Sequence, residues 1–582
     1  MIWGYDFEVF KRLWTVTFIN PIAREKVQIV NDRDRLTKFY KTHKNDILVG
    51  FNSRFYDDWI YKAILCGFDP WDMNEWIILK DKKGYAFSSV LSRINLNSFD
   101  CMTGFYGLKT LEGFCGMDIR ETEIPFDYDG EFTQDMIDKV LYYNEHDVMA
   151  TLRVFIERKA EFDSYMGLIK MFNLPLSYLS KTKAQLSAII LGAKSTKHKD
   201  EFDISIPPTI EISKYQNVVN FFRTDWNYET GLETDIAGVP HVYGTGGLHG
   251  AIPNYYEEGE FLHVDVGSMY PSIMIRYPEY CMSRTGASLE RFTEIRDRRI
   301  EFKKAKDKRA DSLKIVLNGT YGSMKDKYNP LYDARSANNV CIFGQLLITD
   351  LIEHLEGVCD LIQTNTDAVI VKLRGNRDEV VAICKDWENR SGLTLDYHDI
   401  TKIVQKDVNN YVAVFANGKV ESKGAYVKEL NDLDYDLPIV NEAVKQYILH
   451  GTPVSTTINN CTDFRAFQKI VKLSSKYKWV EHEQGHTVIG RKKRGGVIYG
   501  YRSTTKYDNK AYRVFASKDK NDGRLLKCKP TDKKIKKDKF GNTPDNCFIY
   551  NGDVNNVPIP DKLDKSWYIK TATDRLKDFG VI

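Results

Sequence analysis

Two acidic residues stand two positions apart near the start of the chain, Asp6 and Glu8. In a β-strand, alternate side chains point to the same face, so these two would repel each other unless a cation lay between them. Such pairs also occur on solvated strand faces without any function. Asp57, after a buried-looking strand, and Asp147, one helical turn beyond Tyr143, favour a divalent-metal site.

A further acidic position follows an apolar strand, where residues 265–272 read Asp-Val-Gly-Ser-Met-Tyr-Pro-Ser. Asp265 stands at the end of the strand, where a carboxylate can bind a metal ion. The backbone amides of Gly267 and Ser268 could approach a triphosphate, and the ring of Tyr270 could close a sugar pocket. A buried tyrosine before a helix-starting proline would explain Tyr270 alone, but not the whole octet.

Cationic residues with helical spacing follow this octet. Lys314 and Asn318 are one turn apart, so both can face the same ligand. Upstream, Arg296, Arg299 and Lys303 would give a helix one cationic face suited to triphosphate oxygens. A surface helix laced with salt bridges explains these three residues nearly as well, and both interpretations stay open.

The early acidic motifs resemble, in order and spacing, those of the DEDD-type 3′→5′ exonuclease domain: Asp-x-Glu, Asn-x-x-x-Phe/Tyr-Asp and Tyr-x-x-x-Asp. The resemblance implies two metal ions, about 3.5–4 Å apart, that activate water and stabilise the leaving 3′ oxygen. It implies four metal ligands: Asp6, Glu8, Asp57 and Asp147. Tyr143 would then orient the attacking water, and Asn52 would help to hold the single-stranded 3′ end.

The octet at 265–272 resembles motif A of family B DNA polymerases, Asp-x-x-Ser-x-Tyr-Pro-Ser, and residues 314–322 resemble motif B, Lys-x-x-x-Asn-x-x-Tyr-Gly. The resemblance implies that Asp265 and Val266 bind metal and that Tyr270 is the steric gate against a ribose 2′-OH. The nucleotide-binding residues that it implies are Ser268, Met269, Tyr270, Arg299, Lys303, Lys314, Asn318 and Tyr321.

Residues 364–368, Thr-Asn-Thr-Asp-Ala, occupy the place of motif C, whose usual form is Asp-Thr-Asp-Ser after an aromatic residue. Asn365 replaces the first Asp and Ala368 replaces the Ser, whereas Asp367 keeps the acid that pairs with the motif A carboxylate on the metals. The neutral amide lowers the local negative charge, which could alter metal affinity or pH dependence without removing a required ligand. We therefore expect Asp265 and Asp367 to lie on neighbouring strands and to share cations.

Two shorter elements resemble DNA-contacting elements of the same family. Lys423 and Tyr426 fit its Lys-x-x-Tyr element, which contacts the primer–template duplex near its terminus. Tyr243, Gly246 and Gly247 fit, with one extra residue, the Tyr-x-Gly-Gly loop that binds the template strand. The six elements appear in the order of the family and span residues 6 to 426.

The elements that must position these residues indicate a mixed α/β, multidomain chain. Alternating and helical apolar patterns predict strands at 47–51 and 261–266, helices at 133–162 and 288–322, and hairpins at 2–19, 361–371 and 411–421. The resemblance implies an RNase H-like exonuclease domain before a right-hand polymerase with an antiparallel palm sheet, helical fingers and a thumb. The expected segments are 1–165 (exonuclease), 166–254 (connecting region and start of the palm), 255–287 (palm, motif A), 288–330 (fingers), 331–430 (palm, motif C and Lys-x-x-Tyr) and 431–582 (thumb and basic region).

Composition excludes several classes of protein. The 582 residues are 42% hydrophobic, enough to bury a large core, and no stretch reaches the roughly 18 apolar residues of a membrane span. The ten scattered cysteines contain no Cys-x-x-Cys pair, which argues against a structural zinc or iron–sulfur site and fits a reducing compartment. With no signal-peptide pattern at its start, we expect the chain to be soluble and cytoplasmic.

Positive charge is concentrated late in the chain. The net charge is only +3, yet residues 491–540 hold eighteen Lys or Arg residues against five Asp residues. Interleaved aromatic residues are typical of a surface that binds a phosphate backbone. From composition, nucleic-acid binding and a solvated, partly disordered face explain this stretch equally well.

Together the motifs predict a DNA-directed DNA polymerase with a proofreading 3′→5′ exonuclease, using dNTPs and two Mg²⁺ or Mn²⁺ ions in each active site. The expected partners are primer–template DNA and a single-stranded DNA 3′ end, with no membrane; a monomer with replisome accessory proteins is expected. The size resembles that of compact phage enzymes and indicates a phage or mobile-element replicase. Short spacings between motifs A, B and C favour priming from a nucleic-acid 3′ end. Protein priming, or a DNA-binding exonuclease or scaffold with a decayed polymerase site, remain as alternatives.

Overall fold

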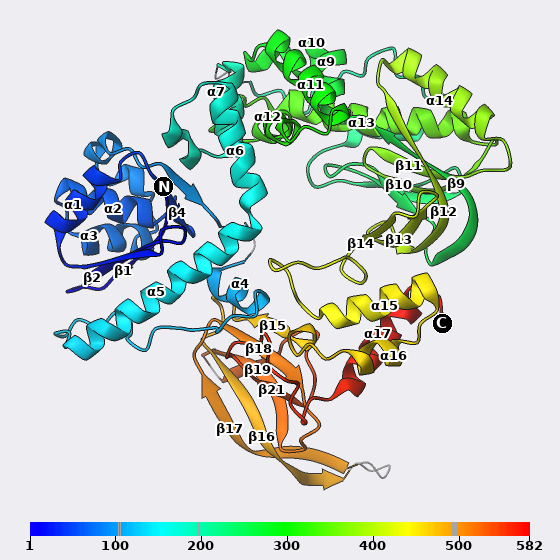
Figure 1. Ribbon diagram of the computed structural model, residues 1–582. Helices are drawn as coiled ribbons and strands as arrows, with labels where there is room; N and C mark the ends of the chain where they lie inside the picture. Colours follow the sequence, from blue (N-terminus) through cyan, green and yellow to red (C-terminus); the bar gives the residue numbers. More distant parts are fainter. Residues whose placement is uncertain (103, 105, 195–197, 492–496, 533) are drawn as a thin grey trace.

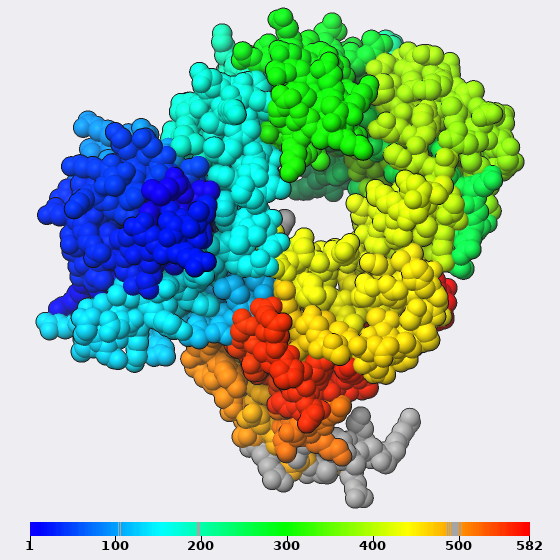
Figure 2. Space-filling view, viewed as in Figure 1, coloured from blue at the N-terminus to red at the C-terminus, as the bar shows by residue number. Residues whose placement is uncertain are grey.

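The chain folds into several α/β units arranged in a ring around a central opening (Figures 1 and 2). This computed structural model describes residues 1–582 except 103, 105, 195–197, 492–496 and 533. Part of the basic stretch expected to bind nucleic acid, residues 492–496 and Lys533, therefore lies outside the described residues.

The first unit is built on a five-stranded sheet with the order β3-β2-β1-β4-β5. The expected hairpin forms from β1 (Ile2–Val9) and β2 (Trp14–Asn20), and β3 (Glu25–Val30) extends it in antiparallel fashion. On the other side, β4 (Ile47–Gly50) and β5 (Ser98–Asp100) add in parallel. The helices of this unit are α1 (Arg33–Thr42), α2 (Asp57–Cys66), α3 (Pro70–Asn74) and α4 (Leu108–Phe114).

A long helix, α5 (Gln134–Glu157), crosses this sheet and begins where the sequence predicts. The Thr133 side chain caps it by accepting a hydrogen bond from the Met136 backbone N–H. The helix ends at Glu157 rather than near 162, and α6 (Lys159–Met171) follows, so the expected boundary at 165 falls inside α6. For residues 166–254 the sequence predicts a connecting region without particular helices or strands. In the structure this segment contains α7 (Lys183–Leu191), α8 (Gln216–Asn220), β6 (Leu232–Ile236) and β7 (Val239–Tyr243).

A nine-stranded sheet forms the second unit, with the order β14-β13-β12-β9-β11-β10-β8-β7-β6. Its remaining strands are β8 (His249–Ala251), β9 (Tyr255–Val266), β10 (Asp360–Asn365), β11 (Ala368–Lys372), β12 (Leu395–Asp407), β13 (Asn410–Phe415) and β14 (Val420–Lys423). Both expected hairpins, β10–β11 and β13–β14, are confirmed. Gly418, in the second turn, has a φ of +82°, which explains why a glycine stands there.

Helices cover one face of this sheet (Figure 1). They are α9 (Met269–Arg276), α10 (Pro278–Cys281), α11 (Leu289–Lys304), α12 (Arg309–Ser323), α13 (Ala334–Leu355) and α14 (Arg377–Ser391). Along β9, Leu262, Val264 and Val266 belong to the main hydrophobic core that these helices complete. Because side chains alternate along a strand, Asp265 and His263 point to the opposite face. The helices thus pack on one face of the sheet, and the face of Asp265 carries a smaller hydrophobic cluster that includes Phe261, Ile370 and Ile400.

The C-terminal region consists of two parts. A helical part contains α15 (Pro438–His450), α16 (Val454–Asn460) and α17 (Lys565–Asp578). The β part has a three-stranded sheet of β15 (Lys469–Lys472), β18 (Ala511–Ala516) and β21 (Cys547–Ile549), and a four-stranded sheet of β16 (Trp479–Arg491), β17 (Val497–Tyr507), β19 (Asp522–Pro530) and β20 (Ile535–Lys539). The β16–β17 hairpin extends away from the central opening (Figure 1).

The C-terminal β part closes the ring by packing on α4 of the first unit. The Arg513 side chain is fully buried, and its guanidinium donates hydrogen bonds to the carbonyls of Gly113 (3.1 Å) and Met117 (2.8 Å). Backbone pairing adds to this contact, since the Val554 N–H donates to the Gly116 carbonyl at 2.9 Å. The segment after β5 is therefore held by residues more than three hundred positions later in the chain.

Two expectations from composition can be compared with the structure. All ten cysteines are free thiols. Within the described part of the chain, none of the helices combines the length and the apolar character that crossing a bilayer requires.

Candidate active sites

The first acidic centre forms where β1 meets α5 and α2. Carboxylate oxygens of Asp6, Glu8 and Asp147 lie within 4.8 Å of one another. Asp57 is the first residue of α2, and its Oδ1 accepts a hydrogen bond from the Phe7 backbone N–H at 3.0 Å, which fixes it beside β1. The structure therefore brings together the four carboxylates that the sequence motifs single out.

This centre carries an unfavourable concentration of buried negative charge. Burial, followed by the charges of neighbouring carboxylates, raises the pKa of Asp6 and Glu8 well above the usual range. Burial also raises the pKa of Asp57 to about 8 and that of Asp147 to about 6. Such a set of hard oxygen ligands fits a divalent cation such as Mg²⁺ or Mn²⁺, whose charge would offset both the burial and the mutual repulsion.

The sequence motifs missed a lysine in this centre. Lys109, on α4, lies 2.5 Å from Asp147 Oδ1 and 2.9 Å from Glu112 Oε1, and its Nζ stands 4.6 Å from the centre of the Tyr143 ring. Burial lowers the pKa of Lys109, but the charges of Asp147 and Glu112 outweigh it, so the pKa lies above the usual value. A single lysine in the first turn of a short helix offers no spacing pattern by which the sequence could reveal it.

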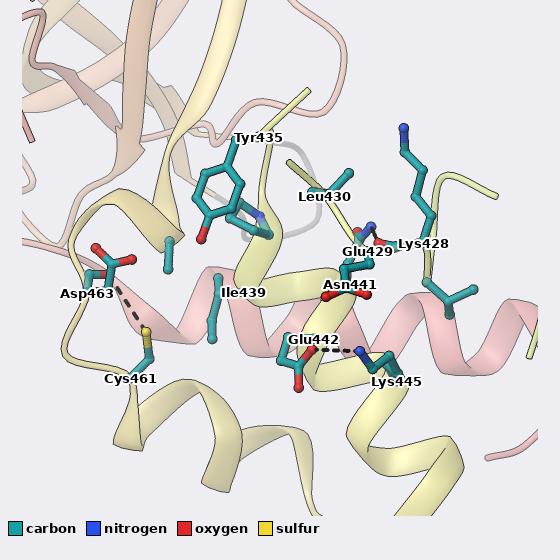
Figure 3. A pocket seen from close by; sticks show the side chains of 13 residues that line it. Lys428, Glu429, Leu430, Tyr435, Ile439, Asn441, Glu442, Lys445, Cys461 and Asp463 are labelled. Atoms are coloured by element: carbon teal, nitrogen blue, oxygen red, sulfur yellow. Dashed lines mark hydrogen bonds and ion pairs between the residues drawn. The ribbon is translucent and has the colours of Figure 1, made fainter. Parts of the chain in front are cut away.

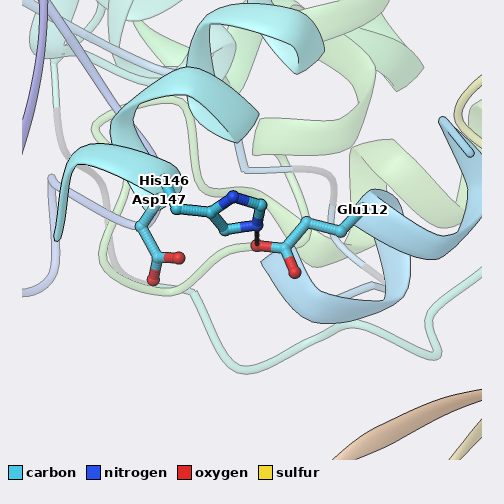
Figure 4. Close-up of side chains that lie close together, drawn as sticks. All are labelled: Glu112, His146 and Asp147. Atoms are coloured by element: carbon cyan, nitrogen blue, oxygen red, sulfur yellow. Dashed lines mark ion pairs between the residues drawn. The ribbon is translucent and has the colours of Figure 1, made fainter. Parts of the chain in front are cut away.

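Glu112, which accepts a hydrogen bond from Lys109, belongs to a second group of side chains with His146 and Asp147 (Figure 4). Glu112 is fully buried, and its Oε1 is 3.6 Å from His146 Nε2. Together with Asp147, these residues form a second group whose ligand atoms lie within 4.8 Å of one another. Because Lys109 already binds both carboxylates, we interpret Glu112 as the residue that orients Lys109 toward Asp147.

Three further residues surround the first centre. Tyr143 faces it, and burial together with the charge of Asp147 raises the pKa of its phenol. Asn144, the next residue along α5, donates a hydrogen bond from Nδ2 to Asp6 Oδ2 at 2.8 Å, and the sequence motifs missed it. Asn52 has a φ of +59°, and its backbone N–H donates to Asp100 Oδ1 at 2.9 Å, which fixes the turn before α2.

The second acidic centre lies on the face of the nine-stranded sheet opposite the one that carries Leu262, Val264 and Val266. Strands β9 and β11 are antiparallel neighbours, with Asp265 directly opposite Ala368, and the Val266 backbone N–H donates to the Asp367 carbonyl at 2.8 Å. Asp265 and Asp367 are therefore close together as expected, but Asp367 lies in the turn between β10 and β11, one residue before β11, rather than on a strand. Burial, then the charges of Asp367 and Asp396, raise the pKa of Asp265 to about 7, and burial raises that of Asp367.

Asp396 is a third carboxylate that the sequence motifs missed. It lies on β12 directly opposite Asp265 in the strand register, so the two side chains share one face of the sheet. Its Oδ2 is 3.8 Å from Lys303 Nζ on α11. The half-buried Asp265 and Asp367, with the more exposed Asp396 beside them, form a donor set that fits a divalent cation.

The three basic residues of α11 do not act alike. Arg299 donates from Nη1 to Ser268 Oγ at 2.7 Å, and Lys303 approaches Asp396, so both lie beside the second acidic centre. Arg296 pairs instead with Asp297 at 2.6 Å. Both interpretations of these residues therefore apply in part. Arg299 and Lys303 lie at the second acidic centre, whereas Arg296 forms a surface ion pair.

The sharp turn between β9 and α9 positions the predicted sugar gate. Ser268 adopts a φ of +51°, and α9 begins at Met269, two residues earlier than a start at Pro271 would give. Amides in the first turn of a helix lack intrahelical acceptors and attract anions. The Tyr270 ring packs against that of Tyr321 on α12, with centroids 4.6 Å apart.

The motif B residues lie along α12. Lys314 and Asn318 are both exposed and one turn apart, so they present one polar face. Leu313, Val316 and Leu317 pack into the main core and fix the orientation of the helix. The side chains expected to face a nucleotide are therefore available on the surface of α12.

The glycine loop packs against the motif C turn. Gly247 has a φ of +112°, and a Cβ there would lie 3.3 Å from the Thr366 side chain, so only glycine suits the position. The Thr366 N–H donates to the Leu248 carbonyl at 2.8 Å. Tyr243 is 0% exposed, and its hydroxyl hydrogen-bonds to that of Thr349 at 2.9 Å, so its side chain supports the sheet rather than offering a surface to DNA.

Two other predicted DNA contacts sit at the end of β14. Lys423 is exposed, whereas the Tyr426 hydroxyl donates to Asp578 Oδ2 at 3.0 Å and so ties this segment to α17. In the described part of the basic stretch, several cations are paired with acids: Lys537 with Glu481, Lys539 with Asp545, and Arg524 with Glu483. This pairing reduces the positive charge that the composition alone suggests.

A cavity of about 270 Å³ lies beside α15 (Figure 3). Its lining includes Tyr435, Ile439, Glu442, Lys445 and Cys461. Glu442 and Lys445 form an ion pair across 3.5 Å. No residue of either acidic centre lines this cavity, which separates it from the chemistry considered above.

Comparison with known proteins gives weak but consistent similarities. No protein-family model matches the chain. It is 25% identical over 177 residues to a DNA polymerase 1 of Sulfurisphaera ohwakuensis (30% of this chain, 19% of the relative) and 25% identical over 215 residues to a DNA polymerase 1 of Saccharolobus solfataricus (34% and 22%). The matches thus span about a fifth of the length of these relatives. A solved structure, the family B DNA polymerase of Pyrobaculum calidifontis, aligns with a TM-score of 0.42 and 14% identity, covering 100% of this chain and 78% of that one.

Proposed function

We propose that this chain, a relative of family B DNA polymerases, is a DNA-directed DNA polymerase that carries a 3′→5′ proofreading exonuclease. The observation that carries the proposal is the closeness of Asp265, on β9, and Asp367, in the turn that leads into the neighbouring strand β11. The four-carboxylate centre of the first unit supports the second activity.

In the synthetic reaction, the primer 3′-OH attacks the α-phosphate of a dNTP and pyrophosphate leaves. Asp265 and Asp367 would hold Mg²⁺ or Mn²⁺, which, when bound, supplies the Lewis acidity that activates the hydroxyl and offsets charge on the phosphates. Arg299 and the first-turn amides of α9 bind the triphosphate. Lys303 adds positive charge beside Asp396.

Selection of the sugar falls to Tyr270. Its ring is fixed by packing on Tyr321, so it cannot move aside easily when a ribose 2′-OH approaches. Lys314 and Asn318 would contact the nucleotide from the exposed face of α12, the helix that also carries Tyr321. This arrangement favours deoxynucleotides over ribonucleotides.

In the proofreading reaction, water attacks the terminal phosphodiester of a frayed 3′ end. Asp6, Glu8, Asp57 and Asp147 would hold the cations there, and Tyr143 orients the water. A mispaired end reaches this centre more readily because separating an unpaired strand costs less.

The expected domain roles follow this division. We assign residues 1–165 to the exonuclease, 255–287 and 331–430 to the palm, 288–330 to the fingers and 431–582 to the thumb, with the primer–template held in the central opening (Figure 2). Several of the described basic residues of 491–540 are ion-paired, and in this assignment the sheet face that carries Asp265 and the rim of the opening contribute to the DNA surface as well.

Primer extension with Mg²⁺ and dNTPs tests the proposal. We expect Asp367→Ala to lose extension but still degrade a single-stranded 3′ end, and Asp57→Ala to do the reverse. Asp127→Ala, which removes an exposed acid far from either centre in the sequence, serves as the matched control and should retain both activities. Equal extension by wild type and Asp367→Ala would refute the polymerase assignment. A wild type that degrades but never extends would instead favour the decayed-polymerase alternative.

A further inference from the structure

A buried cysteine, Cys341, lies beside the predicted sugar gate. It belongs to α13, which packs against α9, the helix that carries Tyr270. Cys341 is only 4% exposed, and the Tyr270 hydroxyl lies 3.9 Å from its Sγ, at the distance of a long hydrogen bond to sulfur. The gate therefore makes a polar contact with α13 in addition to the packing of its ring on Tyr321.

The direction of this hydrogen bond follows from the second partner of the thiol. Cys341 Sγ donates to the Thr245 carbonyl at 3.6 Å. A thiol has a single proton, so the sulfur is left to accept from the Tyr270 hydroxyl. Cys341 thus joins the gate to the glycine loop of residues 243–247.

This loop is itself held by the next turn of α13. Gln345 Oε1 accepts a hydrogen bond from the Gly244 backbone N–H at 3.1 Å, and Gln345 Nε2 donates to the Gly244 carbonyl at 2.9 Å. The same Nε2 lies 3.5 Å from Cys341 Sγ. Because the loop is fixed on α13, the Thr245 carbonyl is a stationary acceptor for the thiol.

The gate ring also lies close to the backbone of α13. A Cβ at Gly344 would lie 3.2 Å from Cε1 of Tyr270 and 2.8 Å from Cε of Met269. Glycine destabilises the interior of a helix, and this close approach explains why it stands there. The Tyr270 side chain is therefore held against α13 along its ring and at its hydroxyl.

The surroundings of Cys341 differ from those of an ordinary core residue. Its neighbours along the helix, Val340 and Ile342, are fully buried in the main hydrophobic core. Cys341 instead meets the Tyr270 hydroxyl, a backbone carbonyl and an amide. It also lies near the phenol of Tyr321, whose pKa is raised by burial first and then by this thiol. An apolar side chain at 341 would remove these polar contacts.

We propose that Cys341 is a positioning residue for the sugar gate, which holds the Tyr270 hydroxyl and so sets how closely the ring approaches the 2′ position of the incoming nucleotide. The inference rests on the proposed polymerase function and adds to sugar selection a residue outside all of the sequence motifs. A Tyr270 ring released from Cys341 can move aside for a 2′-OH. A deoxynucleotide has no group at that position, so its use depends little on this contact.

Incorporation of a single nucleotide tests the inference, with kcat and KM measured for a dNTP and for the matching rNTP. In Cys341→Ala we expect the ratio of kcat/KM for dNTP over rNTP to fall about fivefold, mainly through a lower KM for the rNTP. Cys341→Val fills the space but cannot accept a hydrogen bond, so it should show the same fall. Cys341→Ser keeps a donor and an acceptor and should stay within about twofold of wild type. This ratio does not depend on the fraction of active protein, so partial misfolding cannot imitate the effect.

A double variant shows whether Cys341 acts through the gate. Tyr270→Ala removes the gate, so the further change Cys341→Ala should leave the ratio of that variant unchanged. Cys528→Ala is the matched control, because it removes another buried thiol that donates to a backbone carbonyl, and it should keep the wild-type ratio.

The outcomes separate this inference from the proposed function. If Cys341→Ala and Cys341→Val lower the use of dNTP and rNTP by the same factor, or if the fall in the ratio persists without the Tyr270 ring, the inference is overturned while the polymerase assignment stands. If wild type incorporates neither nucleotide, the proposed function fails and the inference fails with it.

Discussion

The two acidic centres gather carboxylates in different environments. In the first, Asp6, Glu8 and Asp147 are close together and largely enclosed, and a lysine is bound among them. In the second, Asp265 and Asp367 are half-buried, and motif C contributes the amide of Asn365 where the family has an acid. Burial, rather than the number of acids alone, therefore distinguishes the two centres.

This difference teaches how each centre manages its charge. The enclosed centre has a built-in cation, Lys109, that offsets part of the negative charge before any metal binds. The open centre gains a further negative charge from its cross-strand neighbour Asp396, and Lys303 and Arg299 from α11 supply the positive charge beside it. Changes that remove or add a single charge should therefore act on one centre without affecting the other.

The largest effect is expected from Lys109. Lys109→Met should lower exonuclease activity about 100-fold, because a buried charge that binds Asp147 and Glu112 is lost, while primer extension stays within about twofold. Lys109→Arg keeps the charge and should recover part of the activity. Degradation of a labelled single strand, measured beside extension, checks this; a parallel loss of both activities would indicate misfolding instead.

A smaller effect is expected from restoring the missing acid of motif C. Asn365→Asp adds a carboxylate to the turn that precedes Asp367, and charge count raises affinity for divalent cations. The Mg²⁺ concentration for half-maximal extension should fall several-fold, with no change in the Mg²⁺ requirement of degradation. An unchanged Mg²⁺ titration would show that position 365 lies outside the reach of the cations.

Asp396→Asn should shift the pH profile of extension. Asp265 has a pKa of about 7, raised by burial and then by the charges of Asp367 and Asp396. Removing Asp396 lowers this pKa, so Asp265 stays ionised at lower pH and the acid limb of the profile should move downward by a fraction of a pH unit. Extension rates from pH 5.5 to 8 check this; an acid limb that moves upward would contradict it.

The smallest effect concerns stability without metal. A carboxyl group whose pKa is higher in the folded than in the unfolded protein stabilises the fold at low pH, and this contribution is lost as pH rises through the folded pKa. Asp57 has a pKa of about 8. We therefore expect the Tm measured in EDTA to fall by a few degrees as the pH rises from about 4 to about 8.

Asp57→Asn should flatten this fall in differential scanning calorimetry, since the amide does not titrate. Exposed Asp127→Asn is the matched control and should keep the slope of wild type. If the Tm falls with pH at the same slope in all three proteins, ionisation of Asp57 is not the cause of the fall.

Much of this arrangement could be predicted from residue type and spacing. The β1–β2 hairpin, the start of α5 at its Thr133 cap and the hairpin of β10 and β11 all follow from local patterns. The carboxylates of each centre were found because short motifs place them on strand ends and helix faces.

Other features depend on contacts that no local pattern encodes. Lys109 and Asp396 enter their centres through the packing of α4 and the register of β12, which the sequence does not show. Likewise, Arg513 closes the ring by binding carbonyls of Gly113 and Met117, and a buried arginine with carbonyl partners has no sequence signature. The burial of Tyr243 follows from its place in a central sheet, although its motif suggests a surface role.

The most direct test of two separate cation-binding centres is a Mn²⁺ titration followed by electron paramagnetic resonance. We expect the double variant Asp6→Ala with Glu8→Ala to lose one part of the bound Mn²⁺, and Asp265→Ala with Asp367→Ala to lose another. The quadruple variant should lose both parts. Wild-type Mn²⁺ binding in either double variant would contradict the existence of that centre.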